Sequence, residues 1–202
     1  MCHIDKDEGF HLAEMNSNRL RMRASATHRV KILFAIVALI LVILQCSDGM
    51  VEYSRKSEGF SIGFPKGWEL RENVTGYQLP PNTRVLVVAS PPIDPRSSFA
   101  ENINVQVQVT DHQAYATAAF VSLVDFYSEG KASHLPPLDS LTLAGSPAVR
   151  FPLYFKQVGA IGATYVVARG NRVYIVQGTA LEAKWKDFEV LLDKVALSLK
   201  LI

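Results

Sequence analysis

The sequence predicts an α+β domain with a mainly antiparallel sheet and helices packed against it. Three observations predict this class. Residues 102–110 alternate between apolar and polar side chains, as in a strand with one buried face. The pair Gly170-Asn171 separates two apolar runs, 161–168 and 172–180, which is typical of a β-hairpin. Residues 185–199 carry apolar side chains three and four positions apart, which predicts an amphipathic helix.

The first predicted strand covers residues 60–64. Large apolar residues alternate there with small ones, so we expect one face of the strand to be buried. Residues 65–67, Pro-Lys-Gly, predict a turn, after which Trp68 returns a large ring to the same apolar layer. The run 85–89 is apolar throughout, as in a strand that is covered on both faces.

The strand at 102–110 has a polar face as well as an apolar one. Asn104, Gln106 and Gln108 share the polar face, which carries amides and no charge. We expect this face to be solvated, and a polar binding surface is the alternative.

A helix is predicted over residues 112–129, with Asp111 as its N-cap and Gly130 at its end. Its apolar stripe comprises Tyr115, Ala118, Ala119, Ser122, Leu123 and Phe126.

Two further strands are predicted at 141–143 and 149–155, joined by a turn at 145–147. Pro152 cannot donate a ladder hydrogen bond, so it indicates an edge or a bulge. Residues 179–182, Thr-Ala-Leu-Glu, have the spacing of a capping box for the last helix.

The N-terminal region has two parts. Residues 1–21 are polar and without period, which predicts a disordered leader, and Met22 or Met15 are alternative starts of translation. Residues 22–46 hold three basic residues and then thirteen uninterrupted apolar ones, 32–44. This stretch is shorter than the roughly 20 residues that span a bilayer, so it indicates a signal peptide or a signal anchor.

Cys46 follows this apolar run, as in a lipoprotein signal that is cleaved before a cysteine whose thiol carries a diacylglyceryl group. Ile43 and Leu44 fit the apolar positions of such a signal, whereas Gln45 stands where a small residue is expected. We predict Cys46 as the lipid-attachment residue. An uncleaved signal anchor and a cleaved, unlipidated form are the alternatives. Residues 47–57 are interpreted as a polar linker and 58–202 as the domain.

Charge and cysteine content exclude several classes of site. Residues 1–46 hold six basic and four acidic side chains, so the net charge of +2 lies there and 47–202 is neutral overall. A neutral domain argues against nucleic-acid binding. Both cysteines, Cys2 and Cys46, precede the domain, so we expect no disulfide and no cysteine-based metal site in it.

The domain shows no catalytic arrangement in its sequence. Gly145-Ser146-Pro147 is not a nucleophile elbow, and His112 and His134 lack metal-ligand spacing. We predict no catalytic, cofactor-binding or metal-binding residue, no cofactor and no enzymatic activity. A site built from the loops 91–98 and 131–139 is the alternative.

That alternative has a simple structural criterion. It would be favoured if His112, His134, Asp94 and Asp139 gathered at the mouth of one pocket.

Several segments together resemble the PsbP family, including the bacterial PsbP-like and DcrB-type lipoproteins. They are 60–68 (Phe-Ser-Ile-Gly-Phe-Pro-Lys-Gly-Trp), 102–105 (Asn-Ile-Asn-Val), 143–145 (Leu-Ala-Gly) followed by Ala148, and the closing hairpin and helix. The resemblance covers about 58–202. It implies an α-β-α sandwich without catalytic activity.

Photosynthetic members of that family are extrinsic subunits that help retain calcium and chloride at the oxygen-evolving site. This sequence shows neither a matching ion-binding motif nor the N-terminal extension of those subunits, so that role is not carried over.

We therefore expect a non-enzymatic protein that is exported and tethered to a membrane on the periplasmic side of a bacterial cell envelope. Its partners would be the membrane, through a lipid anchor or a signal anchor, and an unidentified envelope or membrane protein whose complex it binds or helps to assemble. The alternatives are a small-ligand carrier or weak enzyme with a loop-built site, and a photosystem II-type extrinsic subunit if the host is photosynthetic.

Overall fold

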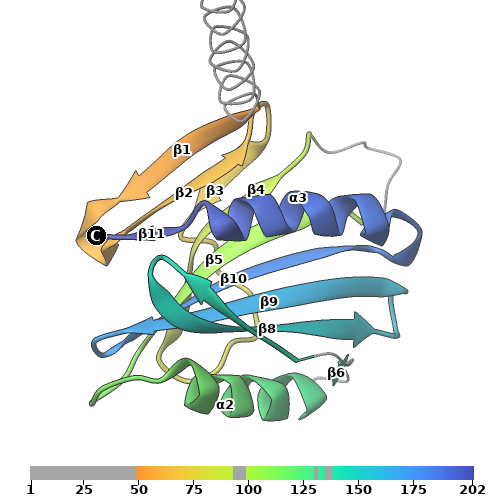
Figure 1. Cartoon of the computed structure of the whole chain (residues 1–202). Helices are drawn as coiled ribbons and strands as arrows, with labels where there is room; N and C mark the ends of the chain where they lie inside the picture. Colours follow the sequence, from red (N-terminus) through yellow and green to blue (C-terminus); the bar gives the residue numbers. More distant parts are fainter. Residues whose placement is uncertain (1–48, 93–98, 130–131, 135–137) are drawn as a thin grey trace, which may run out of the picture. The chain divides into compact units, whose positions relative to one another are not determined.

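A large antiparallel sheet lies between two helices, one on each face (Figure 1). The computed structural model describes residues 49–92, 99–129, 132–134 and 138–202, and all of them belong to the unit Gly49–Ile202. The α+β class and the layered α-β-α arrangement predicted for this domain are confirmed.

The elements have the following bounds. The strands are β1 (Met50–Arg55), β2 (Phe60–Pro65), β3 (Glu69–Glu72), β4 (Thr83–Ser90), β5 (Asn102–Val109), β6 (Ser133–His134), β7 (Asp139–Leu143), β8 (Ser146–Phe155), β9 (Ala160–Arg169), β10 (Arg172–Leu181) and β11 (Lys200–Leu201). The helices are α2 (Ala116–Glu129) and α3 (Trp185–Leu197), with short 3-10 turns η1 (Lys56–Glu58) and η2 (Glu182–Lys184).

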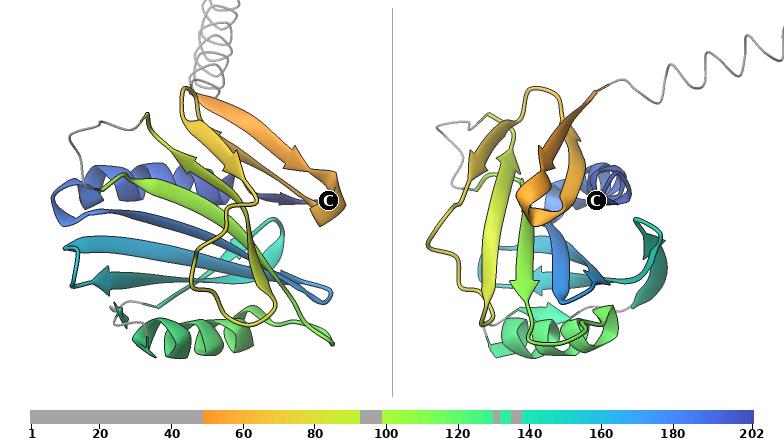
Figure 2. Two further views of the ribbon diagram at one scale, coloured as in Figure 1. Left: turned by 180° about the vertical axis from the view of Figure 1, so that it is seen from behind. Right: turned by 90° about the vertical axis from the view of Figure 1, so that its left-hand side faces the viewer.

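The described strands form two sheets. The main sheet has eight strands in the order β3-β4-β5-β10-β9-β8-β6, with β7 also paired to β8. The small sheet has the order β1-β2-β11 and lies next to α3 (Figure 2). Each strand pairing that connects these elements is antiparallel.

Each face of the main sheet has its own apolar core. The first core joins the sheet to α3 and to β2, and its largest fully buried side chains are Phe60, Ile62, Phe64, Leu86, Ile103, Leu143, Leu192 and Leu199. The second core lies under α2, and its largest fully buried side chains are Leu123, Phe151, Leu153 and Ile175. Helix α2 makes most of its contacts with β6, β8 and β9, so it lies mainly over one half of its face of the sheet.

Close approach of α3 to the sheet depends on Gly178 in β10. A Cβ atom at this position would lie 2.6 Å and 2.8 Å from the two methyl carbons of Leu192 and 3.0 Å from the ring of Phe188. Real Cβ atoms do not come this close to a neighbour, so a glycine is required for α3 to lie where it does. The predicted anchoring role of Trp68 fits this layer, because its ring stacks on Phe188 at 6.4 Å between centroids.

The predicted strands at 60–64, 85–89, 102–110, 161–168 and 172–180 are confirmed with small shifts at their ends. The helix expected near 185–199 is confirmed as α3.

The prediction of one buried face for the first strand is wrong, because β2 is the central strand of the small sheet and is buried on both faces. Its Gly63 N–H donates to Ser198 Oγ at 2.8 Å, which ties β2 to the end of α3.

The linker predicted at 47–57 is wrong for most of its length, because Met50–Arg55 forms β1 and pairs with β2. Met50 and Tyr53 pack against the first core and hold the strand in place. The next turn, η1, carries the buried Glu58, whose carboxylate accepts hydrogen bonds from Arg84 at 2.8 Å and Arg172 at 3.4 Å.

Helix α2 begins four residues later than predicted, so Asp111 is not its N-cap. The β9–β10 turn holds the preceding segment: Thr110 N–H donates to the Asn171 carbonyl at 2.9 Å and Ala114 N–H to the Gly170 carbonyl at 2.8 Å. The buried residues of α2 are consequently Ala116, Ala119 and Leu123, whereas Tyr115 is exposed. The residue predicted to end this helix, Gly130, lies outside the described residues.

The turn predicted at 145–147 lies one residue earlier, at Ala144-Gly145, where both residues have positive φ. Pro152 lies in β8 between the residues that pair with β7 and those that pair with β6, which agrees with the expected interruption of an edge. The capping box at 179–182 is wrong, because Thr179–Leu181 belong to β10.

Within the described residues, neither helix is long and apolar enough to cross a membrane. The predicted leader, the signal segment 22–46 and the lipid-attachment residue Cys46 lie outside the described residues.

Candidate functional site

The residues named for a loop-built site are not brought together where the structure describes them. Asp94 lies outside the described residues, and of His134 only the backbone position in β6 is described. His112 lines shallow hollows beside the start of α2, whereas the Asp139 carboxylate accepts a hydrogen bond from Arg150 Nη1 at 3.3 Å. Among the described residues, no group of three or more His, Cys, Asp or Glu side chains could hold a metal ion.

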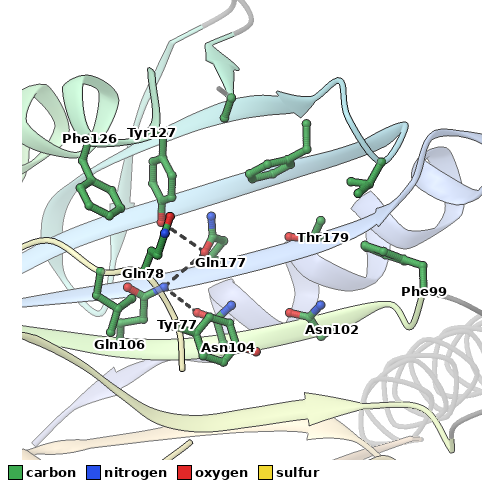
Figure 3. A pocket seen from close by; sticks show the side chains of 14 residues that line it. Tyr77, Gln78, Phe99, Asn102, Asn104, Gln106, Phe126, Tyr127, Gln177 and Thr179 are labelled. Atoms are coloured by element: carbon green, nitrogen blue, oxygen red, sulfur yellow. Dashed lines mark hydrogen bonds between the residues drawn. The ribbon is translucent and has the colours of Figure 1, made fainter. Parts of the chain in front are cut away.

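A pocket of about 290 Å³ lies instead on the half of the sheet that α2 leaves uncovered (Figure 3). Strands β5 and β10 form its floor, and the last turns of α2, the β8–β9 turn and the segment 77–79 form its walls. We call it the amide pocket, lined by Tyr77, Gln78, Leu79, Phe99, Asn102, Asn104, Gln106, Phe126, Tyr127, Ala132, Phe155, Val158, Gln177 and Thr179.

The alternating pattern of β5 places the amides on this floor. Ile103, Val105 and Val107 belong to the first core, so the side chains between them point to the opposite face. Register then sets Asn104 of β5 beside Gln177 of β10. Figure 3 shows the amides of the two strands side by side.

The prediction that this polar face is solvated is wrong for its two central residues. Asn104 is 2% exposed and Gln106 is 1% exposed. Their cover comes from Tyr127 in α2 and from the segment 77–79, which are distant in sequence, so the alternation within β5 gave no indication of it. The alternative, a polar binding surface, is compatible with the observed geometry.

A short hydrogen-bond chain joins the buried amides. Gln106 Nε2 donates to Asn104 Oδ1 at 2.8 Å and to Gln177 Oε1 at 3.2 Å. Tyr127 OH also donates to Gln177 Oε1 at 3.2 Å. Gln106 Oε1 is fully buried and has no partner among the described residues. A buried acceptor without a donor costs about 1–3 kcal/mol, so Gln106 lowers the stability that the other hydrogen bonds of this chain provide.

The electrostatics of the pocket are those of a neutral site. None of the lining side chains that the structure describes is charged. Burial raises the pKa of the Tyr127 phenol, so it stays protonated at neutral pH and acts as a hydrogen-bond donor. The amides can donate and accept hydrogen bonds but cannot exchange a proton with a substrate near neutral pH. The pocket is therefore suited to binding.

Sequence reasoning missed the aromatic walls of this pocket. Phe126 and Tyr127 come from the end of α2, Tyr77 from an irregular segment and Phe155 from the end of β8. In the sequence, the pocket could be inferred only from the alternating amides of β5 and from Gln177, which lies in the second strand of the β9–β10 hairpin.

A second polar cluster surrounds Arg150 and connects β8 to α3. Its guanidinium donates to Tyr165 OH at 2.9 Å and to Asp139, and it also forms an ion pair with Glu189. Burial alone would lower the pKa of Arg150, but Tyr165 and the carboxylates of Glu189 and Asp193 raise it overall. Burial and a hydrogen bond to Asp193 raise the pKa of Tyr165. Because these charged and polar groups are paired with one another, we interpret the cluster as a structural connection between β8 and α3.

Comparison with known proteins shows the fold. No protein-family model matches the chain, and no curated protein sequence matches it. The chain is similar to the solution structure of cyanobacterial PsbP (CyanoP) from Synechocystis sp. PCC 6803, with a TM-score of 0.59 and 18% identity over 76% of this chain and 93% of that one. The fold is therefore PsbP-like.

A weaker likeness is found to the crystal structure of LpqN, a protein involved in cell envelope biogenesis of Mycobacterium tuberculosis. Its TM-score is 0.48 and its identity 11%, over 76% of this chain and 86% of that one.

Proposed function

We propose that this chain is a non-enzymatic binding protein, exported and tethered to a membrane, which engages an envelope or membrane protein complex through the face that holds the amide pocket. The observation that carries the proposal is the pocket itself: a walled site whose described side chains carry no charge and whose floor holds several amide groups. Such groups recognise a ligand by hydrogen bonds and contribute no acid–base chemistry.

The tether is proposed from the sequence of residues 22–46. A basic segment followed by an apolar run and Cys46 supports export and attachment through lipid at Cys46, or through the apolar run itself. Attachment confines the domain near the membrane and raises its effective concentration there, so a weak contact with a membrane partner suffices. A small-ligand carrier is the second candidate, because the pocket is walled on several sides and has its own polar floor.

Intact mass of the protein extracted from native membranes tests the tether, with Cys46→Ala as the comparison. We expect a mass that begins at Cys46 and includes acyl groups, and we expect the variant to lose them and to leave the membrane fraction. A mass that retains the apolar run without modification would replace the lipid anchor by a signal anchor. Recovery of both forms from the soluble fraction would contradict tethering altogether.

Photo-crosslinking in the same membranes tests the binding face. A photoreactive phenylalanine analogue replaces Tyr77, which is 40% exposed at the pocket, or Tyr115, which is 64% exposed and does not line it. We expect a discrete crosslinked envelope protein from position 77 and none from position 115. Equal products from both positions, or none from either, would reject this face as the binding surface.

A further inference from the structure

We propose that the amide pocket binds one uncharged sugar unit, an inference that rests on the proposed function of this domain as a binding protein. A free sugar and the terminal unit of an envelope glycan offer the same chemistry. The inference depends on the charge, hydrogen-bonding groups, shape and size of the pocket.

The charge of the described lining favours a neutral ligand. A ligand with a carboxylate, phosphate or ammonium group would bury that charge against side chains that, among those described, carry no opposite charge. Burial of an unpaired charge is costly, so this lining favours a ligand without one.

The polar floor excludes a purely apolar ligand. Five amide side chains and the Thr179 hydroxyl line the pocket, and Gln78, Asn102 and Thr179 among them are exposed or half-buried and so open to a ligand. An apolar body would remove water from these groups without replacing its hydrogen bonds. The ligand therefore carries several groups that donate and accept, and hydroxyl groups do both.

The sheet also disfavours an extended peptide. Strands β5 and β10 pair with each other throughout the floor, from Asn102↔Thr179 to Val109↔Arg172, so their backbone groups serve the ladder. A peptide that adds to a sheet needs a free strand edge, and the pocket offers a sheet face with side chains only.

Shape and size agree with one sugar ring. The volume of about 290 Å³ lies at the lower end of the roughly 300–1,000 Å³ found for small-ligand pockets, which suits a ligand of one ring with its hydroxyl groups. Aromatic rings stand around the amide floor, with Phe126 and Tyr127 on the α2 side of the amides and Tyr77 beside Asn104 (Figure 3). A sugar ring presents hydroxyls at its rim and C–H groups on its faces, which matches amides below and aromatic rings beside it.

The test is a titration of the full chain in detergent micelles, followed by NMR of the Asn and Gln side-chain amides. The neutral probes are glucose, galactose and N-acetylglucosamine, and the charged probes of equal ring size are glucosamine and glucuronic acid. We expect at least one neutral sugar to shift the pocket amides and the charged sugars to bind about tenfold more weakly or not at all. Methyl glycosides of the binding sugar distinguish a free sugar from the terminal unit of a glycan. A site that binds the end of a glycan tolerates a substituent at the linkage oxygen.

Two pairs of variants assign the binding to this pocket. Gln106→Leu replaces the central amide of the pocket floor by an apolar side chain, and its control is Gln113→Leu, an exposed glutamine that does not line the amide pocket. Tyr77→Ala removes a wall at the pocket mouth, and its control is Tyr115→Ala. We expect each pocket variant to weaken binding about tenfold or more and each control to bind as the unaltered chain does. If Gln106→Leu does not fold, the comparison of Tyr77→Ala with Tyr115→Ala still tests whether the sugar binds in this pocket.

Three results would overturn the sugar inference: no shift with any neutral sugar, equal binding of charged and neutral sugars, or full binding by Tyr77→Ala. The proposed function is judged separately. A crosslink from position 77 without sugar binding would remove the sugar inference and keep the binding face. Sugar binding without a crosslink would keep the pocket and remove the protein partner.

Discussion

Each face of the main sheet has an apolar core, but the two faces differ where β5 and the end of β10 form them. Towards α3, strands β5 and β10 present apolar side chains such as Val105 and Val176, both fully buried in the first core. Towards α2, the same strands present Asn104, Gln106 and Gln177, which line the amide pocket. The first face is covered by α3 and β2, whereas α2 lies mainly over β6, β8 and β9 on the other face.

This difference shows how one strand performs two tasks. Because successive side chains point to opposite faces, the residues at odd positions of β5 supply packing energy while those at even positions are available for recognition. We therefore expect substitutions on the α3 face to reduce stability strongly, and substitutions on the pocket face to affect binding far more than stability.

The largest effect is expected for Leu192→Ala in α3. Leu192 is fully buried and contacts the sheet at Gly178, so truncation should lower the free energy of unfolding by about 2–5 kcal/mol, measured by urea denaturation. Leu197→Ala in the same helix is the matched control. Its side chain is 62% exposed, and we expect a change below about 0.5 kcal/mol. A similar loss in both variants would show that α3 is not packed as described.

A smaller loss, of about 1–3 kcal/mol, is expected for Gly178→Ala, because the added methyl group overlaps the Leu192 side chain. The two positions are in contact, so their effects should not add. Once Leu192→Ala has removed the overlapping methyl carbons, Gly178→Ala should cost much less than it does alone. Strict additivity in this double-mutant cycle would contradict the close approach of β10 and α3.

The smallest effect on stability is expected for Gln106→Leu on the pocket face. The substitution leaves the buried Asn104 Oδ1 without its donor, which costs about 1–3 kcal/mol, and it removes the unpaired Gln106 Oε1, which returns a similar amount. The remaining change is the lost hydrogen bond to Gln177, so the net loss should be about 0.5–1.5 kcal/mol.

Val105→Ala, one residue away on the opposite face, is the comparison for this variant. It should cost about 2 kcal/mol for two buried methyl groups and the cavity that they leave. A larger loss for Gln106→Leu than for Val105→Ala would mean that the amides hold the fold together.

The sequence was sufficient to predict those elements of the fold that depend on local residue patterns. Alternation at 102–110 located β5 and its two faces, and Gly170-Asn171 located the β9–β10 turn. The amide pocket could not be predicted, because its contacts join residues far apart in the chain: Gln106 and Gln177 are separated by 71 positions, and Tyr127 and Gln177 by 50.

The errors at the N-terminal side of the domain have the same origin. The segment around Met50–Arg55 has too few apolar residues to indicate a strand, and it becomes β1 because β2 lies beside it. The predicted start of α2 failed because the distant β9–β10 turn binds residues 110–114. Nothing in the local sequence reports either contact.

The small sheet has a consequence for the order of folding. Its central strand, β2, pairs on one side with β1, which is adjacent in sequence, and on the other with β11, where Lys200 lies opposite Ser61. Closing a loop of this length is slow compared with forming a hairpin such as β9–β10. A chain synthesised from its N-terminus therefore leaves one edge of β2 unpaired until residues 200–201 have been made.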